Sequence, residues 1–466
     1  MNASRYERDF LTLWWLNPAI LFCVCGLLIG IAAYLIDEPF YRSFWRTPKF
    51  FDTNALLVTL ACIAVFAFGA VVSVTQMARV VPRVTPADNG NLTERIPRSL
   101  LLTLFRITFW LTVLGYALWI GLAIQRGITP EVVLRVAAGE KGAMYEARFN
   151  YLPTVAGVTT LAEFGTATAI LGALFGSIHG WAAVRWKLGI LFLLALVRAV
   201  LNSERLALIE LVVPFVIACL PFWLSRSSTR SWWDRSKKTR IAWKLAPVIG
   251  AGSLWVLFTT FEYVRSWKNY YSGGELGLWA FGAVRLLGYY VTSFNNGAFL
   301  LARLDPLNAP YFMLHFLWLF PLSNPVVHRL FQNPLLDTNE RWFYFPFLQG
   351  GANVEFNNAD GILSPLMDYG IASGLIYWFF AGMACGLLYE LYRRKEPAGL
   401  LMYPAIYLGL MEAPLVLYWA EGRCVPSLSI LLLAPVLFRF WSAAHRRPLR
   451  PAVVRMRVST VSRPTA

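Results

Sequence analysis

The sequence alternates long apolar segments with polar connections. Ten of these segments approach the ~20 residues that a helix needs to cross the hydrocarbon core of a bilayer. In lipid, every backbone N–H and C=O group must be paired within its own segment, so we expect each of them to be an α-helix. The ten predicted spans are residues 17–36, 54–77, 99–123, 154–177, 186–201, 206–224, 245–261, 366–389, 401–420 and 425–441.

One connection is far longer than the others. Residues 262–367 separate the seventh and eighth predicted spans and hold most of the non-basic polar sequence. The predicted fold class is therefore all-α: a polytopic helical bundle with one long loop that contains short helices. The predicted parts are residues 1–261 with seven spans, 262–367 as the long loop, 368–441 with the last three spans, and 442–466 as a basic tail.

Two apolar runs rich in aromatic residues, 276–290 and 311–322, lie within the long loop. They are too apolar to stay solvated, so we expect them to lie along the membrane surface or to dip into it. The alternative is that one or both cross the membrane. A single additional span would reverse the topology of everything that follows it.

The composition agrees with a membrane bundle. Hydrophobic residues make up 57% of the 466 residues and charged residues only 15%, and the mean hydropathy is +0.52. A water-soluble globule needs a far more charged surface. The composition therefore excludes that class.

Lysine and arginine collect in the connections that follow the even-numbered spans and in the C-terminal tail. Such connections are cytoplasmic by the positive-inside rule, which also places both termini in the cytoplasm. The net charge of +16 is then a topology signal together with attraction to anionic membrane lipids. Because the basic clusters lie beside spans and not on a separate domain, no nucleic-acid partner is expected.

No cofactor and no metal are expected. The six cysteines lie within spans or at the start of the last one, without zinc spacing or a disulfide framework. The chain has no Asp-x-Asp pair and no Gly-x-x-x-x-Gly-Lys loop, so a soluble nucleotide donor is not supported.

Several arginines lie on the predicted outer side, against the positive-inside trend. A guanidinium group offers a permanent charge and a planar fork of donors, which suit diphosphate and carboxylate groups. The alternative is that they anchor lipid headgroups or pair with Glu146, Glu204 or Glu262. These arginines are Arg135, Arg148, Arg205, Arg265, Arg285, Arg303, Arg329 and Arg341.

Few carboxylates accompany these arginines. A carboxylate near them could act as a general base on a sugar hydroxyl. It could equally cap a helix, and Asp368 lies close enough to the eighth span to interact with its dipole. The acidic residues in or at the end of the loop are Asp305, Asp337, Glu340, Glu355, Asp360 and Asp368.

Three further glutamates, Glu163, Glu210 and Glu412, fall inside predicted spans. A carboxylate is costly in lipid, so we expect all three to face the interior of the bundle. They either serve function there or form hydrogen bonds between helices.

The end of the long loop carries the most specific pattern. Residues 349–374 read Gln-Gly-Gly-Ala-Asn-Val-Glu-Phe-Asn-Asn-Ala-Asp-Gly-Ile-Leu-Ser-Pro-Leu-Met-Asp-Tyr-Gly-Ile-Ala-Ser-Gly and lead into a glycine-spaced span that ends at Tyr389. This resembles the O-antigen polymerase-like (Wzy-type) family, with Tyr369 where that pattern has phenylalanine. Residues 202–205 and 285–296 are also similar to elements of that family.

The resemblance implies a polysaccharide polymerase with an architecture like that of GT-C membrane glycosyltransferases. Such an enzyme joins undecaprenyl-diphosphate-linked oligosaccharide repeat units at the periplasmic face of a bacterial inner membrane, with a repeat-unit flippase and a chain-length regulator as partners. Fixed arginines could stabilise the diphosphate leaving group without a metal. The candidate bases are Asp368, Asp360 and Glu355, and the candidate substrate-binding residues are Arg135, Arg148, Arg205, Arg265, Arg285, Arg341, Asn353 and Tyr289.

Other functions stay open. An O-antigen ligase-like enzyme shares this layout and donor, and its loop histidine would be His315 or His328. A transporter or flippase would use residues within the spans as its pathway, but the unequal loops and the absence of repeats argue against it. Its pathway residues would be Glu163, Arg198, Glu210 and Glu412. A scaffold subunit of an envelope assembly complex is the last alternative.

Overall fold

A computed structural model shows an all-helical protein. It describes residues 13–80, 92–152, 154–155, 157–202, 204–226, 243–274, 276–336 and 342–444. Helices, turns and loops make up these ranges, and no strand occurs among them. The predicted all-α class is confirmed.

Eight helices in the described ranges are long and apolar enough to cross a membrane. They confirm the expectation of a multi-pass membrane protein. They are α2 (Pro18–Leu35), α4 (Thr53–Val80), α6 (Arg98–Gln125), α9 with α10 (Val158–Ala162 and Gly165–His179), α12 (Leu206–Arg226), α14 with the π-helix η5 (Ala246–Glu262 and Tyr263–Tyr271), α20 (Ile371–Arg393) and α22 (Val425–Ala444).

Two more predicted spans correspond to α11 (Arg185–Asn202) and α21 (Pro397–Glu412). Helix α11 packs one face against α10 and α12, and α21 is largely buried against α12, α20 and α22. Helix α21 has only 16 residues, and α11 carries Arg185, Lys187 and Arg198. By length and composition, therefore, neither is among the eight.

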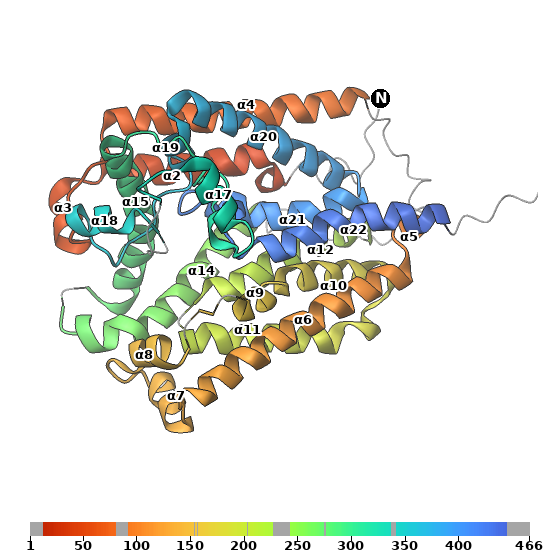
Figure 1. Cartoon of the computed structure of the whole chain (residues 1–466), viewed down its shortest axis with the longest axis horizontal. Helices are drawn as coiled ribbons and strands as arrows, with labels where there is room; N and C mark the ends of the chain where they lie inside the picture. Colours follow the sequence, from red (N-terminus) through yellow and green to blue (C-terminus); the bar gives the residue numbers. More distant parts are fainter. Residues whose placement is uncertain are drawn as a thin grey trace, which may run out of the picture.

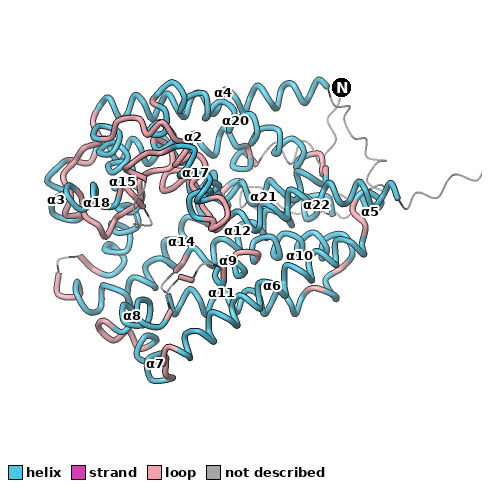
Figure 2. Tube along the Cα trace, viewed as in Figure 1, coloured by secondary structure: helices cyan, strands magenta, loops and turns pink. Residues whose placement is uncertain are grey.

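The bundle is elaborated at one end, which we call the loop end. Figure 2 shows much of the non-helical chain there, and α2 begins and α22 finishes at the opposite end (Figure 1). The elements that gather at the loop end in Figure 1 are α3 (Glu38–Phe44), α7 (Pro130–Ala137), α8 (Ala143–Glu146), α15 (Leu278–Arg303) and α18 (Phe345–Gly351).

Shorter elements complete the described chain. They are η1 (Trp14–Leu16), α5 (Leu92–Arg95), the π-helix η3 (Ala147–Tyr151), η4 (Trp181–Ala183), α16 (Phe316–Leu319), α17 (Asn324–Phe331), α19 (Ser364–Tyr369) and η6 (Tyr418–Ala420).

Side-chain caps mark the starts of two helices of the loop end, α3 and α7. The Asp37 carboxylate accepts a hydrogen bond from the backbone N–H of Phe40 (3.1 Å) at the start of α3. The Thr129 hydroxyl accepts one from Val132 (3.4 Å) at the start of α7. Each satisfies a backbone donor that the first turn of a helix leaves unpaired.

Three spans have a boundary that differs from the prediction by five residues or more, and one of them is the ninth, α21, which ends at Glu412 and not at residue 420. The seventh span continues through η5 to Tyr271, whereas we expected it to end at residue 261. The eighth span begins at Ile371 and not at residue 366, because Gly370, with φ of +88°, separates α19 from α20. Glycine adopts this left-handed backbone without the steric cost that a side chain would bring.

The first apolar run of the long loop belongs to a helix that is longer than predicted. Helix α15 has 26 residues, packs on α14 and α2, and runs across the loop end of the bundle in Figure 1. It is not one of the eight candidate spans.

The second apolar run folds inward. Tyr311, Phe312 and Trp318 are buried together with Phe343 and Leu348 in a core that belongs to the loop itself. We expected these aromatic residues at headgroup depth, whereas the structure packs them inside the loop; that the run lies along the membrane surface or dips into it stays a prediction. The loop supplies apolar partners that the sequence pattern alone did not reveal.

Small residues let α4 and α20 approach closely along their length. A Cβ atom at Gly382 would overlap the carbonyl oxygen of Phe66, and one at Gly386 would overlap that of Ala70. From the other helix, a Cβ at Gly69 would overlap the carbonyl oxygen of Phe379. Glycines spaced four apart are a common basis for helix association in membranes.

The α4–α20 contact predicts the effect of Gly382→Val. Because the added side chain must push the two backbones apart, we expect a loss of about 1–3 kcal/mol in stability. The melting temperature (Tm) of the detergent-solubilised protein measures it. The matched control is Gly121→Val, since nothing lies within 4 Å of a Cβ at Gly121. Equal shifts in the two variants would contradict this account of the packing.

Candidate functional site

A buried carboxylate, Glu262, lies at the centre of three arginines at the loop end. It ends α14 and is 0% exposed. Its Oε1 lies 3.2 Å from Nη2 of Arg205 and 3.6 Å from Nη1 of Arg265, and its Oε2 lies 3.6 Å from Nε of Arg285. The structure thus brings together three of the predicted substrate-binding arginines. We call Glu262 and these three residues the arginine cluster.

The three arginines of the cluster come from different elements of the fold. Arg205 directly precedes α12, Arg265 lies in η5, and Arg285 is on α15. Glu262 and Arg265 are three residues apart, a spacing that places two side chains on one face of a helix. The hydroxyl of Ser266 donates to Glu262 Oε2 (2.6 Å) and holds the carboxylate in place.

Aromatic rings surround the guanidinium groups. The Arg205 guanidinium lies 3.8 Å from the centre of the Phe258 ring, a cation–π contact. Nη1 of Arg265 donates to the hydroxyl of Tyr289 (3.1 Å), the predicted substrate-binding tyrosine. Tyr289 in turn packs edge-on against Phe356, 5.1 Å between ring centres.

Glu355 is the candidate base that lies at the arginine cluster. It forms an ion pair with Nη2 of Arg285, and its side chain is 37% exposed, so it borders the solvent. Asn353 shapes the turn that carries it. Oδ1 of Asn353 accepts from the Glu355 N–H (3.0 Å), and its Nδ2 donates to the Trp45 carbonyl (2.9 Å). The predicted role of Asn353 thus becomes one of positioning Glu355.

The cluster holds more positive than negative charge. Three arginines face the two carboxylates of Glu262 and Glu355. Nη1 of Arg205, Nε of Arg285 and Oε1 of Glu262 are buried and make no hydrogen bond within the described residues, although Nε of Arg285 lies at ion-pair distance from Glu262. A buried donor without an acceptor costs free energy, so the two arginine donors favour an anion with several oxygens, such as a phosphate or diphosphate.

The other two candidate bases bond to the backbone of the loop. Asp360 is 2% exposed and accepts from the N–H groups of Ile362 (2.8 Å) and Leu363 (3.2 Å). Asp368 is 0% exposed and accepts from those of Phe312 and Met313, both at 2.9 Å. Burial raises the pKa of Asp360 to about 8 and that of Asp368 to about 7. The Asp368 carboxyl thus connects two segments of the loop, whereas the Asp360 carboxyl closes a local turn.

The remaining predicted arginines lie apart from these contacts. Arg135 pairs with Glu140 (3.0 Å) and Glu146 (3.3 Å) in the α7–α8 region. Arg148 is exposed, with its guanidinium 5.9 Å from the Phe149 ring centre. Arg303 and Arg329 are also exposed. Arg341, Asp337 and Glu340 lie outside the described residues.

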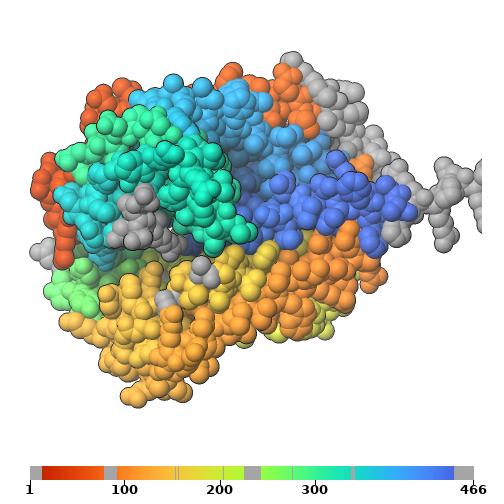
Figure 3. Space-filling view, in the orientation of Figure 1, coloured from red at the N-terminus to blue at the C-terminus, as the bar shows by residue number. Residues whose placement is uncertain are grey.

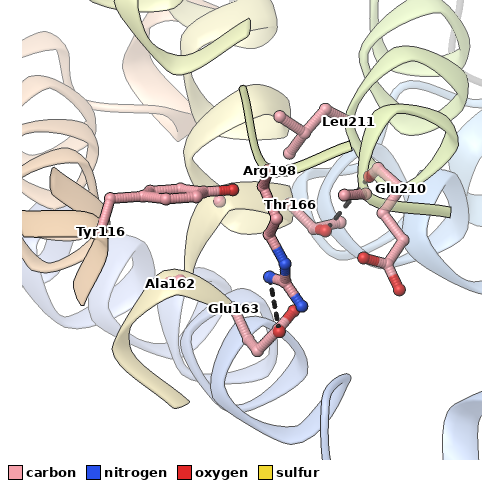
Figure 4. A pocket seen from close by; sticks show the side chains of 9 residues that line it. Tyr116, Ala162, Glu163, Thr166, Arg198, Glu210 and Leu211 are labelled. Carbon is pink, nitrogen blue, oxygen red and sulfur yellow. Dashed lines mark hydrogen bonds and ion pairs between the residues drawn. The ribbon is translucent and has the colours of Figure 1, made fainter. Parts of the chain in front are cut away.

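A second group of charges lies within the bundle beside the arginine cluster. Nη1 of Arg198 pairs with Glu163 (2.9 Å), and its Nε donates to Glu204 (3.0 Å). Nη1 of Arg423 lies 3.3 Å from Glu204 and 3.2 Å from Glu210. Figure 4 shows Arg198 beside Glu163 at a cavity of about 10 Å³, room for about one water molecule.

This second group answers the question of the glutamates within the spans. Glu210 and Glu412 are buried and Glu163 is half-buried, as expected of carboxylates that face the bundle interior. Glu163, between α9 and α10, forms an ion pair with Arg198 of α11, and Glu210 of α12 forms one with Arg423 in the turn before α22. Because Glu204 directly precedes Arg205 and is bound by two arginines, the group also holds the start of α12 in place.

Sequence reasoning considered Glu262 only as a salt-bridge partner and did not place it at the centre of the site. Its position at the end of an apolar span, three residues before Arg265, was the available signal. Nothing local in the sequence indicated the contributions of Phe258 and Ser266. Within the described residues, no group of three or more His, Cys, Asp or Glu side chains could hold a metal ion.

The burial of Asp368 predicts a pH dependence. Its pKa is about 7 in the fold against an ordinary value of 3.8, so the fold favours the protonated form. The stability from this group is fully present below about pH 4 and is lost as the pH rises toward 7. We expect Tm to fall over that range in the wild type and to fall less in Asp368→Asn. Exposed Asp305 offers the control, and an equal effect of Asp305→Asn would contradict the assignment.

Comparison with known proteins adds no identity. No family model matches the chain, no curated protein matches it, and no solved structure matches it. The chemistry of the arginine cluster is therefore the basis on which a function can be assigned.

Proposed function

We propose that the protein is a membrane glycosyltransferase that polymerises undecaprenyl-diphosphate-linked oligosaccharide repeat units. Its site would be the arginine cluster, at the periplasmic face of a bacterial inner membrane. The single observation that carries this proposal is the convergence of Arg205, Arg265 and Arg285, with buried donors that lack acceptors, at the loop end of a membrane bundle.

The chemistry of such a transfer suits these residues. Breaking the bond between the sugar C1 and the diphosphate oxygen leaves negative charge on the lipid diphosphate. Fixed guanidinium groups in a site of low dielectric stabilise that charge without a metal. The surrounding aromatic rings exclude water and offer apolar faces to the sugars.

Glu355 would be the general base. The hydroxyl of the acceptor sugar gives its proton to the Glu355 carboxylate while the hydroxyl oxygen forms the new bond to C1 of the donor sugar. In the free protein Glu355 is paired with Arg285. A bound diphosphate would compete for the same guanidinium group and so release the carboxylate for this proton transfer.

The sequence supports the same assignment. Glu355 lies in the stretch 349–374 that resembles the polymerase family, and Asn353 of that stretch holds the Glu355 turn. The positive-inside distribution of lysine and arginine places the loop end on the periplasmic side and both termini in the cytoplasm. A repeat-unit flippase and a chain-length regulator would be the partners.

The ligase alternative would need a histidine at this site. His315 is buried, and both of its ring nitrogens have partners, the Tyr311 hydroxyl (3.1 Å) and Glu421 Oε1 (3.2 Å). His328 is half-buried on α17. Neither makes a described contact with the arginine cluster, so the geometry favours the polymerase.

Removal of cluster arginines tests the proposal. We expect Arg205→Ala, Arg265→Ala and Arg285→Ala each to lower transfer about a hundredfold, because each removes a donor to the leaving group. Arg329→Ala is the matched control, since Arg329 is an exposed arginine of the same loop. The measurement is the length distribution of the surface glycan after each variant is returned to a deletion strain.

The same length distribution of the surface glycan distinguishes a polymerase from a ligase. Loss of polymerisation leaves single repeat units attached to the surface carrier, whereas loss of ligation leaves none. Normal glycan lengths in all three arginine variants would contradict the proposal that the arginine cluster is the site of polymerisation.

The three candidate bases give different results in kinetics. We expect Glu355→Gln to lower kcat by roughly 10²–10⁴-fold with little change in KM, because proton transfer and not binding is lost. Asp360→Asn and Asp368→Asn should lower Tm instead, since both carboxyls bond to the backbone. Transfer between purified lipid-linked repeat units in proteoliposomes measures this. A normal kcat in Glu355→Gln would remove Glu355 from the mechanism.

A further inference from the structure

Helices α16 and α17 form a small hairpin with a well-packed inner side. Trp318 and Val327 are buried, and the Trp318 ring lies 5.9 Å from that of Phe331. Nδ2 of Asn324 donates to the Trp318 carbonyl (2.8 Å), and the Ser323 hydroxyl donates to the Leu317 carbonyl (2.7 Å). The hairpin is therefore anchored, and its outer side is held in a definite direction.

The outer side carries an apolar row. Leu322, Val326 and Leu330 are 92%, 54% and 69% exposed. Val326 and Leu330 are four residues apart on α17, so they lie one above the other on a single face, and Leu322 lies in the turn that directly precedes the helix. Aliphatic side chains in such a row are costly to leave in water, which indicates that an apolar phase covers them.

The hairpin lies at the depth where spans end. A Cβ on Gly422 would lie 3.1 Å from Cδ1 of Leu319, and His315 bonds to Glu421. Glu421 and Gly422 form the turn that leads into α22, one of the eight candidate spans. Figure 1 places α17 beside the start of α22, and Figure 3 shows the surface of this segment next to that of α22.

We propose that the row Leu322, Val326 and Leu330 inserts into the lipid leaflet at the loop end and fixes the long loop at the membrane surface. The occupant of this face is the acyl-chain region of the bilayer. This inference does not depend on the proposed enzymatic activity.

The charge beside the row fits a membrane surface. His328 and Arg329 occupy the last turn of α17, and Arg329 is exposed. A long basic side chain beside an inserted apolar row reaches up to the anionic headgroups, as in other helices that lie in the interface. A surface that binds a protein partner is instead expected to carry aromatic anchor residues, and the row has none.

Photo-crosslinking of the full-length protein tests the insertion. A diazirine amino acid replaces Val326 or Leu330, and the protein is placed in bilayers of phosphatidylethanolamine and phosphatidylglycerol. After illumination, mass spectrometry compares lipid adducts with products of reaction with water. The control carries the same amino acid at Arg329, on the same helix but outside the row.

We expect several-fold more lipid adduct at positions 326 and 330 than at position 329. Equal and low lipid adduct at all three positions would show that the row faces water and would overturn the proposal. Crosslinks to a second copy of the chain at positions 326 and 330 would overturn it as well. Because no glycan transfer is measured, a failure here leaves the proposed polymerase activity to its own test.

Discussion

The attraction between Glu262 and three guanidinium groups is the constraint on which the loop end depends. The carboxylate is fully buried, and Arg205, Arg265 and Arg285 reach it from the residue before α12, from η5 and from α15. Removing the carboxylate would leave three cations close together in a site of low dielectric. The pairing therefore holds three segments together, yet one carboxylate cannot satisfy every donor that surrounds it. The donors left over are the basis for our proposal that the site binds an anion.

The long loop is a folded cap because it supplies its own core and its own polar connections. Asp360 and Asp368 bond to backbone N–H groups, and Tyr311 and Trp318 pack beneath them. The fold therefore places the three candidate bases, Glu355, Asp360 and Asp368, in different surroundings, although their positions in the sequence are similar. Two are enclosed in the cap, whereas Glu355 borders the solvent beside Arg285.

Much of the membrane architecture could be predicted from hydropathy, because lipid imposes a length and a composition on every span. The ends of individual spans could not be predicted, because Gly370 and the π-helix η5 act locally and change the averaged hydropathy very little. Arg205, Arg265 and Arg285 could be singled out because cations on the predicted outer side oppose the topology rule. Arg135 satisfied the same criterion, yet the fold pairs it with Glu140 and Glu146 instead.

By itself, the sequence determined that the chain is a multi-pass helical membrane protein with one long loop and an excess of arginine around it. Residue type and periodicity are sufficient for that, because the bilayer is a uniform solvent. Only the tertiary structure decided which charges meet. Arg205 and Arg285 are far apart in the chain, and both approach Glu262 only after α12, α14 and α15 have packed. The strength of an ion pair depends on distance and burial, and neither can be read from a residue's place in the chain.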